Sequence, residues 1–424
     1  MTAPQAEDEA AAGRWRLLAL LTVINALNFV DRHLVASFAN YIVPDLGLSN
    51  TEFALITGFV FVCFYAVGGL VMGLAADTLH RPRLIAAALA LWSVLTAISG
   101  AARGFLSLAL PRMLIGVGEA ALTPASMSLI AERFPRAQLG LASGVYYAGV
   151  PLGAGLSLIM AGALGPLIGW RACFMILGVA GILLAPALLL VRDTRPSLPV
   201  GGALRDHLAA VIAEGWRALR ASRALRFTIL GGLGLHLLIG AGAFEQLWLV
   251  RERGFDRAQI ALLSGVAAIG MGLAGNLCGG ALGDLWRRRT GRSRAEFVFW
   301  LLIAFAPLGL AYRLVAPGSP LFWAGFCLAY FQLGAFYGPT FSTLQELCSP
   351  SARASLIAFA ILVLNLVGVA GGATVCGLLV DALAGWGVNQ PYTWTLFGLG
   401  CVAAASAPLF LLAGRWQRRE EAEQ

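Results

Sequence analysis

Four ionisable residues lie inside long apolar stretches of the chain. Asp31 and Arg32 interrupt one stretch, and Arg112 and Glu119 interrupt another. An ionisable side chain in the middle of a membrane-spanning helix costs roughly 3 kcal/mol, so it is expected to face a cavity or a partner. A carboxylate whose arginine partner is present in one conformation and absent in another can bind and release a proton. These residues therefore predict a buried site for proton exchange that is linked to conformation.

The spacing of the four residues suggests how they pair. Arg112 and Glu119 are seven residues apart and share one face of a helix, whereas adjacent residues such as Asp31 and Arg32 point about 100° apart. We predict that Asp31 pairs with Arg112 in one conformation and that Asp31 is the first candidate for the proton, before Glu119. A static polar brace between helices is the alternative, because some buried ion pairs have only that role.

A polar stripe continues from Arg32 along the same helix. Thr22, Asn25, Asn28 and Arg32 recur at intervals of three or four residues, which is the spacing of one helical face. We predict that Asn25, Asn28 and Arg32 contact a bound ligand, with Arg32 on an anionic group. Hydrogen bonding between helices is the alternative for the asparagines, and a place at the outer gate is the alternative for Arg32.

The second half of the chain offers weaker candidates for ligand contacts. His236 lies in the middle of an apolar stretch, and Glu245 lies nearer its end, while Gln332 and Tyr337 share a later stretch. We predict that all four contact the ligand. The alternatives are that His236 bridges two helices and that Glu245 is solvated near the membrane interface.

The composition predicts the scaffold for these residues. Of the 424 residues, 59% are hydrophobic and only 12% are charged, with a mean hydropathy of +0.78, whereas about a quarter of a soluble domain is charged. Apolar blocks of about 18 or more residues read as membrane-spanning helices. We predict an all-α polytopic membrane protein with twelve spans, near 15–38, 52–76, 83–102, 105–131, 138–163, 170–191, 226–250, 257–283, 296–315, 319–345, 354–383 and 391–414.

The distribution of arginine orients the spans. The chain has no lysine, and under this topology 22 of its 30 arginines lie on one side and six on the other. Because cytoplasmic loops are enriched in basic residues, both termini are predicted to be cytoplasmic. The domains are then a six-helix bundle over 1–192, a linker over 193–225 with an amphipathic surface helix near 203–219, a second six-helix bundle over 226–415 and a tail over 416–424.

An internal repeat supports two equivalent halves. "GLAADTLHRPR" (73–83) and "GALGDLWRRR" (280–289) each contain glycine, three residues, aspartate and then a basic run, and their aspartates are 207 residues apart. Each aspartate can pair with nearby arginines and cap a helix. We predict that these loops hold the cytoplasmic side closed in one conformation; the alternative is that the arginines only orient the chain. The predicted gating residues are Asp77, Arg81, Arg83, Asp284, Arg287 and Arg288.

These loops resemble the signature loops of the major facilitator superfamily, and "GVYYAGVPLGAG" (144–155) is similar to its helix-5 pattern. "NFVDR" (28–32) and "PRMLIGVGEAALTPASMSLIAERF" (111–134) resemble the spinster branch, whose known members move lysolipids and sphingosine phosphates. The resemblance implies two pseudo-symmetric bundles that rock around a central site. It also implies a proton-coupled secondary transporter of an amphiphilic anionic lipid, such as a lysophospholipid or a sphingosine phosphate. A proton symporter of small organic acids, as in the anion:cation symporter branch, is the alternative.

Other classes of protein find little in the sequence. We see no phosphate-binding loop, no metal-type cluster and no nucleophile beside a base, so we expect no enzyme, no metal, no cofactor and no nucleic-acid partner. A sensor on the same fold stays open as an alternative. The composition, rich in alanine, leucine and arginine, is typical of a bacterial inner-membrane protein, which we expect to be a monomer in contact with membrane lipid.

Overall fold

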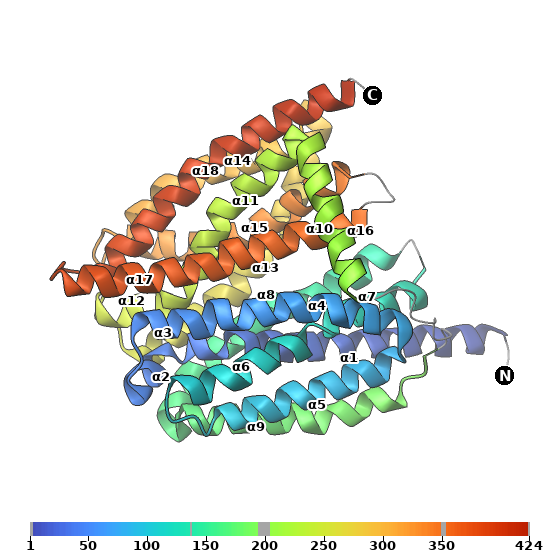
Figure 1. Ribbon diagram of the computed structural model, residues 1–424, viewed down its shortest axis with the longest axis horizontal. Coiled ribbons are helices and arrows are strands. Elements are labelled where there is room, and N and C mark those ends of the chain that lie inside the picture. Colours follow the sequence, from blue (N-terminus) through green and yellow to red (C-terminus); the bar gives the residue numbers. More distant parts are fainter. Residues whose placement is uncertain (1–2, 136–137, 194–203, 349–352, 423–424) are drawn as a thin grey trace.

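The computed structural model describes residues 3–135, 138–193, 204–348 and 353–422. Every regular element in this part of the chain is a helix (Figure 1). The elements of the first half and the linker are α1 (Ala3–Ser37), α2 (Ala39–Leu46), α3 (Asn50–Leu55), η1 (Ile56–Val60), α4 (Phe61–Thr78), α5 (Arg81–Ser99), α6 (Phe105–Glu119), α7 (Leu122–Arg133), α8 (Leu139–Ala163), α9 (Gly165–Leu184), η3 (Ala185–Leu190) and α10 (Leu204–Ala221). Those of the second half are α11 (Arg223–Ala241), η4 (Gly242–Phe244), α12 (Glu245–Arg251), α13 (Arg257–Thr290), α14 (Arg294–Ala311), α15 (Pro320–Glu346), α16 (Arg353–Val363), η5 (Leu364–Ala370), α17 (Gly371–Gly385) and α18 (Pro391–Ala422).

Twelve helical segments are long and apolar enough to cross a membrane, as the sequence predicted. Several are composite, because short breaks and π-helical or 3-10 turns interrupt a single span. The segment α13 continues past its predicted end at 283 through the arginine run to Thr290, where Gly291 adopts a left-handed conformation with φ 66° and ends it. Helices can extend beyond the hydrocarbon, so hydropathy alone places that end too early.

The helices form two bundles that meet at one end and separate at the other (Figure 1). Both termini lie at the separated end, which we call the terminal face. The opposite end carries α2, α12 and residues 386–390, and we call it the far face. Here one apolar core includes side chains from both halves, and the rings of Phe53 and Phe244 meet across it at 5.3 Å. The halves are therefore sealed together at the far face.

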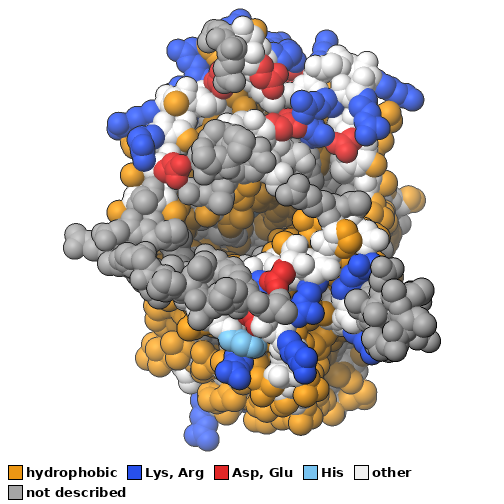
Figure 2. Space-filling model, turned by 90° about the vertical axis from the view of Figure 1, so that its right-hand side faces the viewer, with side chains coloured by type: hydrophobic (Ala, Val, Ile, Leu, Met, Phe, Trp, Pro, Cys, Tyr) orange, Lys and Arg blue, Asp and Glu red, His pale blue; other side chains and the backbone are white. Residues whose placement is uncertain are grey.

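The terminal face is open between the halves. Figure 2 views this face and shows it hollowed between the two bundles, with hydrophobic side chains deep in the hollow. The apolar cores near this face are separate: one belongs to the first half and two to the second. The molecule has thus adopted one state of a two-sided device, with access from the terminal face alone.

Two long helices, α8 and α13, connect the halves along their length. A β-carbon placed on Gly155 or on Gly265 would lie 2.7 Å from the carbonyl oxygen of the other residue. Only glycine lets the two backbones approach so closely, as small residues do at helix contacts in membranes. The glycine-rich pattern of 144–155 is therefore explained by packing between the halves.

Two π-helical turns lie opposite each other on another seam between the halves. They are η1, between α3 and α4, and η5, between α16 and α17. Gly58 of η1 is so close to η5 and α17 that an added β-carbon would lie 2.8 Å from the β-carbon of Ala373. Single π turns inside α-helices are uncommon and are frequent at functional positions.

The linker contains the helix predicted near 203–219, observed as α10. It packs on the second half, where Val211 joins a small apolar core with Ile229 and Phe359. It also contacts α4 of the first half. The linker helix therefore lies across the seam between the halves at the terminal face (Figure 1).

Candidate functional site

The four charged residues of the first half form two ion pairs between α1 and α6. Asp31 pairs with Arg112, with 3.3 Å between Oδ1 and the guanidinium. The same guanidinium donates to the backbone carbonyls of Asp31 and Arg32, each at 3.2 Å. The second carboxylate oxygen of Asp31 accepts a hydrogen bond from the hydroxyl of Thr96 on α5. Asp31 and Arg112 are both buried, so this pair is fully enclosed.

The second pair is Arg32 with Glu119, at 3.2 Å. The Arg32 guanidinium also lies over three rings, at 4.7 Å from Phe29, 5.3 Å from Phe61 and 4.3 Å from Tyr65. Such cation–π contacts are favourable, the more so when they are desolvated. The side chain of Arg32 is 22% exposed, whereas that of Glu119 is 0% exposed. Arg32 is thus the one accessible charge of the four.

The close packing of α6 against its neighbours brings these charges together. Gly116 lies against the backbone of α4, where an added β-carbon would be 2.8 Å from the carbonyl oxygen of Phe61. Gly118 faces Trp92 of α5 in the same way, at 3.4 Å. The helix then ends at Glu119, and a turn at residues 120–121 leads into α7. The two glycines let α6 approach α4 and α5 closely enough for its charges to reach α1.

Several polar atoms of this site lack a hydrogen-bond partner among the described protein atoms. They are Nδ2 of Asn28, Nε of Arg112 and Oε1 of Glu119, all buried. Almost all buried polar groups in proteins are paired, so unpaired ones mark a site for a ligand, a water molecule or a proton. The free oxygen of Glu119 is the acceptor beside the accessible arginine.

The predicted polar stripe on α1 divides into two parts. Asn25 donates from Nδ2 to the carbonyl of Tyr146 on α8 at 2.9 Å, and Thr22 donates to a carbonyl of its own helix at 2.8 Å. These two therefore take part in helix packing, which is the alternative reading of the stripe. Asn28 and Arg32 keep unused or accessible polar groups, and ligand contact by Asn25, Asn28 and Arg32 stays a prediction.

The candidates of the second half do not form a comparable cluster. The Nδ1 of His236 hydrogen-bonds within α11 at 2.8 Å, and its ring meets those of Phe336 and Tyr337 at 5.8 and 5.9 Å. The charge of Arg32 acts electrostatically on Tyr337 across the halves. Gln332 lies beside Gly309 on α14. Of these residues, Tyr337 is the one that faces the arginine of the first half.

Glu245 lies apart from them, next to the far face. Its two carboxylate oxygens accept from the hydroxyl of Tyr312 and from the guanidinium of Arg313, both at 3.0 Å. All three residues belong to the second half and are partly or fully buried. Glu245 therefore braces that half internally.

The first predicted gating loop is tied within its own half. Arg81 pairs with Glu132 and with Asp193, and it donates to the hydroxyl of Ser128 at 2.9 Å. Arg83 is exposed. The side chain of Asp77 lies outside the described residues.

The second loop shows the equivalent arrangement. Arg287 pairs with Glu346, and Arg294 bridges Glu346 and Asp284, at 2.7 Å from the latter. Arg288 is exposed. Among the described side chains, no ion pair joins the two halves at the terminal face, as fits an open face.

Sequence reasoning missed the polar lock at the far face. Asp381 of α17 accepts hydrogen bonds from Asn50 and Thr51 of α3, involving the backbone amide and the side chain of each, at 2.6–3.3 Å. The sequence contains only one hint of it, a capping box formed by Ser49 and Glu52 that fixes the start of the helix. Nothing local connects that start to an acid more than 300 residues away.

Other kinds of site find no support in the described part of the chain. The seven cysteines are free thiols. In the same residues, no group of three or more histidine, cysteine or acidic side chains is placed to hold a metal ion. The chemistry available is that of ion pairs, protons and an apolar hollow.

Comparison with known proteins is consistent with this geometry. The sequence profile of the Major Facilitator Superfamily matches residues 21–376. An "MFS-type efflux pump" of Mycolicibacterium smegmatis is 31% identical over 90% of both chains. The "Sphingosine-1-phosphate transporter SPNS2" of Xenopus tropicalis is 25% identical over 90% of this chain and 76% of its own.

A solved structure, described as a bacterial homolog of the human lysosomal transporter Spinster in an inward-facing and occupied conformation, has a TM-score of 0.79. It is 23% identical and covers 95% of this chain and 97% of its own. The twelve spans, the repeated loops and these matches agree, and the chain belongs to the Major Facilitator Superfamily of transporters, with homologues among the spinster proteins.

Proposed function

We propose that this transporter carries an amphiphilic anion, such as a lysophospholipid or a sphingosine phosphate, and that proton exchange drives it. The observation that carries the proposal is the Arg32–Glu119 pair. It combines one accessible cation in a ring of aromatic side chains with one buried acid that has a free oxygen. The relative named as a sphingosine-1-phosphate transporter supports the substrate class.

The head group of the substrate would bind at Arg32. A phosphate or carboxylate forms its best contacts with a guanidinium, which offers several donors in one plane. The aromatic rings around Arg32 fix its position, and the hollow that leads to it has hydrophobic walls (Figure 2). A charged pole at one end of an apolar cavity fits a head group with an acyl chain.

The proton would exchange at Glu119. When a substrate anion takes over Arg32, Glu119 loses its cationic partner in a buried position, and protonation then becomes favourable. Asp31 differs, because Arg112 and Thr96 engage both of its oxygens. We therefore place Glu119 at the substrate-linked step and assign Asp31 with Arg112 to the change of conformation.

The arginine distribution supports cytoplasmic termini. The terminal face is then the cytoplasmic face of a bacterial inner membrane, and the molecule is open inward. In the opposite conformation the two basic loops would meet and close this face.

The test is uptake into proteoliposomes of a labelled lysophospholipid and a labelled sugar acid, with and without a proton gradient. We expect gradient-driven movement of the lipid alone, and its loss in Arg32→Gln. The matched control is Arg103→Gln, which removes an arginine from an exposed loop. Movement of the sugar acid instead would favour the organic-acid alternative, and equal losses in both variants would remove Arg32 from the site.

A further inference from the structure

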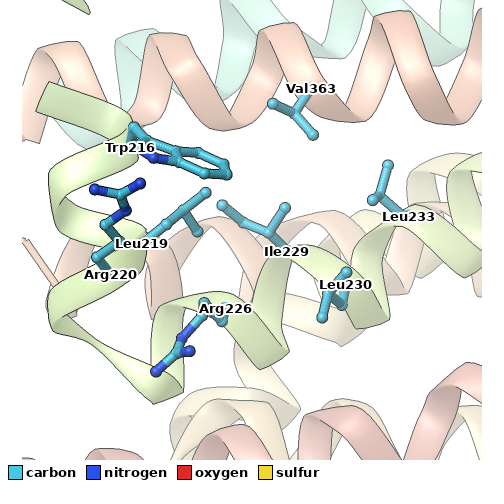
Figure 3. Close-up of a pocket in the computed structure, with 8 residues that line it drawn as sticks. All are labelled: Trp216, Leu219, Arg220, Arg226, Ile229, Leu230, Leu233 and Val363. Atoms are coloured by element: carbon cyan, nitrogen blue, oxygen red, sulfur yellow. The ribbon is translucent and has the colours of Figure 1, made fainter. Parts of the chain in front are cut away.

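A second cavity lies outside the central hollow, on the second half at the terminal face. It has a volume of about 380 Å³ and is formed by three residues of α10, four of α11 and Val363 of α16 (Figure 3). The indole of Trp216 and the side chains of Leu219 and Ile229 border the same space from two helices. The cavity is apolar inside, and its lining includes two arginines.

These two arginines, Arg220 and Arg226, are exposed. Neither forms an ion pair with a described carboxylate, and Arg220 lies over the ring of Trp216 at 5.3 Å. Nearby Arg223 differs: its backbone amide donates to Glu420 and its guanidinium lies over Trp416 at 4.3 Å. The rim of the cavity therefore carries two positive charges that the described protein does not neutralise.

The cavity lies where hydrocarbon would meet water. Two membrane spans begin beside it, at Arg223 and at Leu356. Trp216 is 52% exposed and Leu230 is 49% exposed, an aromatic and an aliphatic side chain at the depth where interfacial tryptophan is enriched. The amphipathic helix α10 forms one wall, and such helices lie in the interface plane.

From this combination we propose that the cavity binds one anionic phospholipid of the adjacent leaflet. The phosphate and the anionic head group contact Arg220 and Arg226, and an acyl chain lies along Leu230, Leu233 and Val363. Basic pockets beside membrane helices recognise anionic head groups in this way. A zwitterionic lipid binds more weakly because its ammonium group meets two arginines. This site does not depend on the identity of the transported substrate.

Binding there would also fix the linker. The cavity joins α10 to α11, and Gly215 of α10 already packs against the ring of Phe359 on α16. A lipid bridging Arg220 and Arg226 adds a link between the two helices. The helix that crosses the seam between the halves would then move with the second half.

The test is native mass spectrometry of the purified full-length protein, incubated with phosphatidylglycerol or phosphatidylcholine. We expect one retained phosphatidylglycerol, and about tenfold weaker retention in the double variant Arg220→Gln/Arg226→Gln, because charge-assisted contacts are lost. The matched control is Arg217→Gln/Arg289→Gln. It removes the same charge from two exposed positions that do not line the cavity, one of them on α10.

A third variant, Leu233→Trp, fills the cavity and keeps both arginines. It should also reduce retention, while soluble glycerol phosphate should not compete. The proposal is overturned if the control loses as much lipid as the double variant, if phosphatidylcholine is retained equally, or if glycerol phosphate displaces the lipid. Thermal unfolding of each variant without added lipid separates misfolding from loss of the site.

Discussion

Asp381 of the second half caps a helix of the first half, since its Oδ2 accepts from both the backbone amide and the hydroxyl of Thr51, at 2.8 and 2.6 Å. The first turn of a helix has backbone amides without partners inside the helix. Here a carboxylate from the opposite bundle satisfies them. The cap exists only while the far face is closed, so it stabilises that one conformation of the transporter.

Removing this cap should open the far face. In Asp381→Asn the negative charge at the helix start is lost, and losing a cap costs about 1 kcal/mol. We expect the equilibrium to shift toward the outward-open state by roughly fivefold to tenfold. Spin labels at residues 103 and 386 would report it as a longer distance across the far face.

The control for this change is Asp256→Asn, which removes a cap within a single half. Asp256 accepts from the amides of Ala258 and Gln259 at 3.0 and 2.9 Å. It should lower stability without lengthening the distance across the far face. Equal distance changes in both variants would show that Asp381 acts on stability alone.

A change at Glu119 should separate substrate movement from proton movement. Glu119→Gln keeps the shape and one hydrogen bond to Arg32 but cannot exchange a proton. We expect substrate exchange between two equal pools to continue, while uptake driven by a proton gradient falls by at least about tenfold, as for the loss of an essential proton carrier. The measurement is labelled substrate flux in both modes.

Asp31→Asn is the comparison for Glu119. It breaks an enclosed ion pair and leaves the Arg112 guanidinium uncompensated, which costs about 3–5 kcal/mol. We expect a lower thermal unfolding temperature, which Glu119→Gln should not produce to the same extent. If Glu119→Gln retains full gradient-driven uptake, Glu119 is not the coupling residue.

The close approach of α8 and α13 can be tested with two glycines of one helix. A β-carbon on Gly265 would lie 2.7 Å from the carbonyl oxygen of Gly155, whereas one on Gly270 would have no atom within 4 Å. Gly265→Ala should lower stability by about 1–3 kcal/mol, as overpacking does. Gly270→Ala should leave stability unchanged or raise it by up to about 1 kcal/mol. Thermal unfolding in detergent measures both, and equal effects would contradict the packing described.

The far face also contains an acid whose contribution depends on pH. Hydrogen bonds from the indole of Trp170, at 2.9 Å, and from Arg171 lower the pKa of Asp45 below its ordinary value. A lowered pKa in the folded state adds stability above the unfolded pKa of about 3.9, and this is lost as the pH falls through the folded value.

Because Asp45 is about half exposed, Asp45→Asn should cost no more than about 1 kcal/mol at pH 7. The difference from the unmodified protein should vanish near pH 3. Unfolding temperatures measured across this pH range would check the prediction, and a difference that persists at pH 3 would contradict it.

The spans and the Asp31–Arg112 pair could be predicted because each depends on short stretches of sequence. Span length follows from local hydropathy, and helical spacing shows which residues of α6 share a face. The pairing of Arg32 with Glu119 could not be derived, because it depends on the relative depth of two helices. That depth is set by the packing of Gly116 on Phe61, which no sequence pattern specifies.

The contacts of the gating loops were harder still to predict. Arg81 finds Glu132 and Asp193, and the latter lies at the start of the linker, where the sequence suggests only a polar break. Asp381 looks like an ordinary residue near a helix end, because its partners lie more than 300 residues earlier. Such pairs arise from the arrangement of the bundles, so they become visible only with the fold.

The facing π turns η1 and η5 give the seam between the halves spare backbone. A π turn uses i to i+5 hydrogen bonds, so it contains one residue more than the α-helical turn it replaces. Passing that extra residue along the chain rotates everything between its old and new positions by about 100° about the helix axis. The helices on both sides of the seam therefore have slack, and they can turn against each other while nearly every hydrogen bond along them stays made.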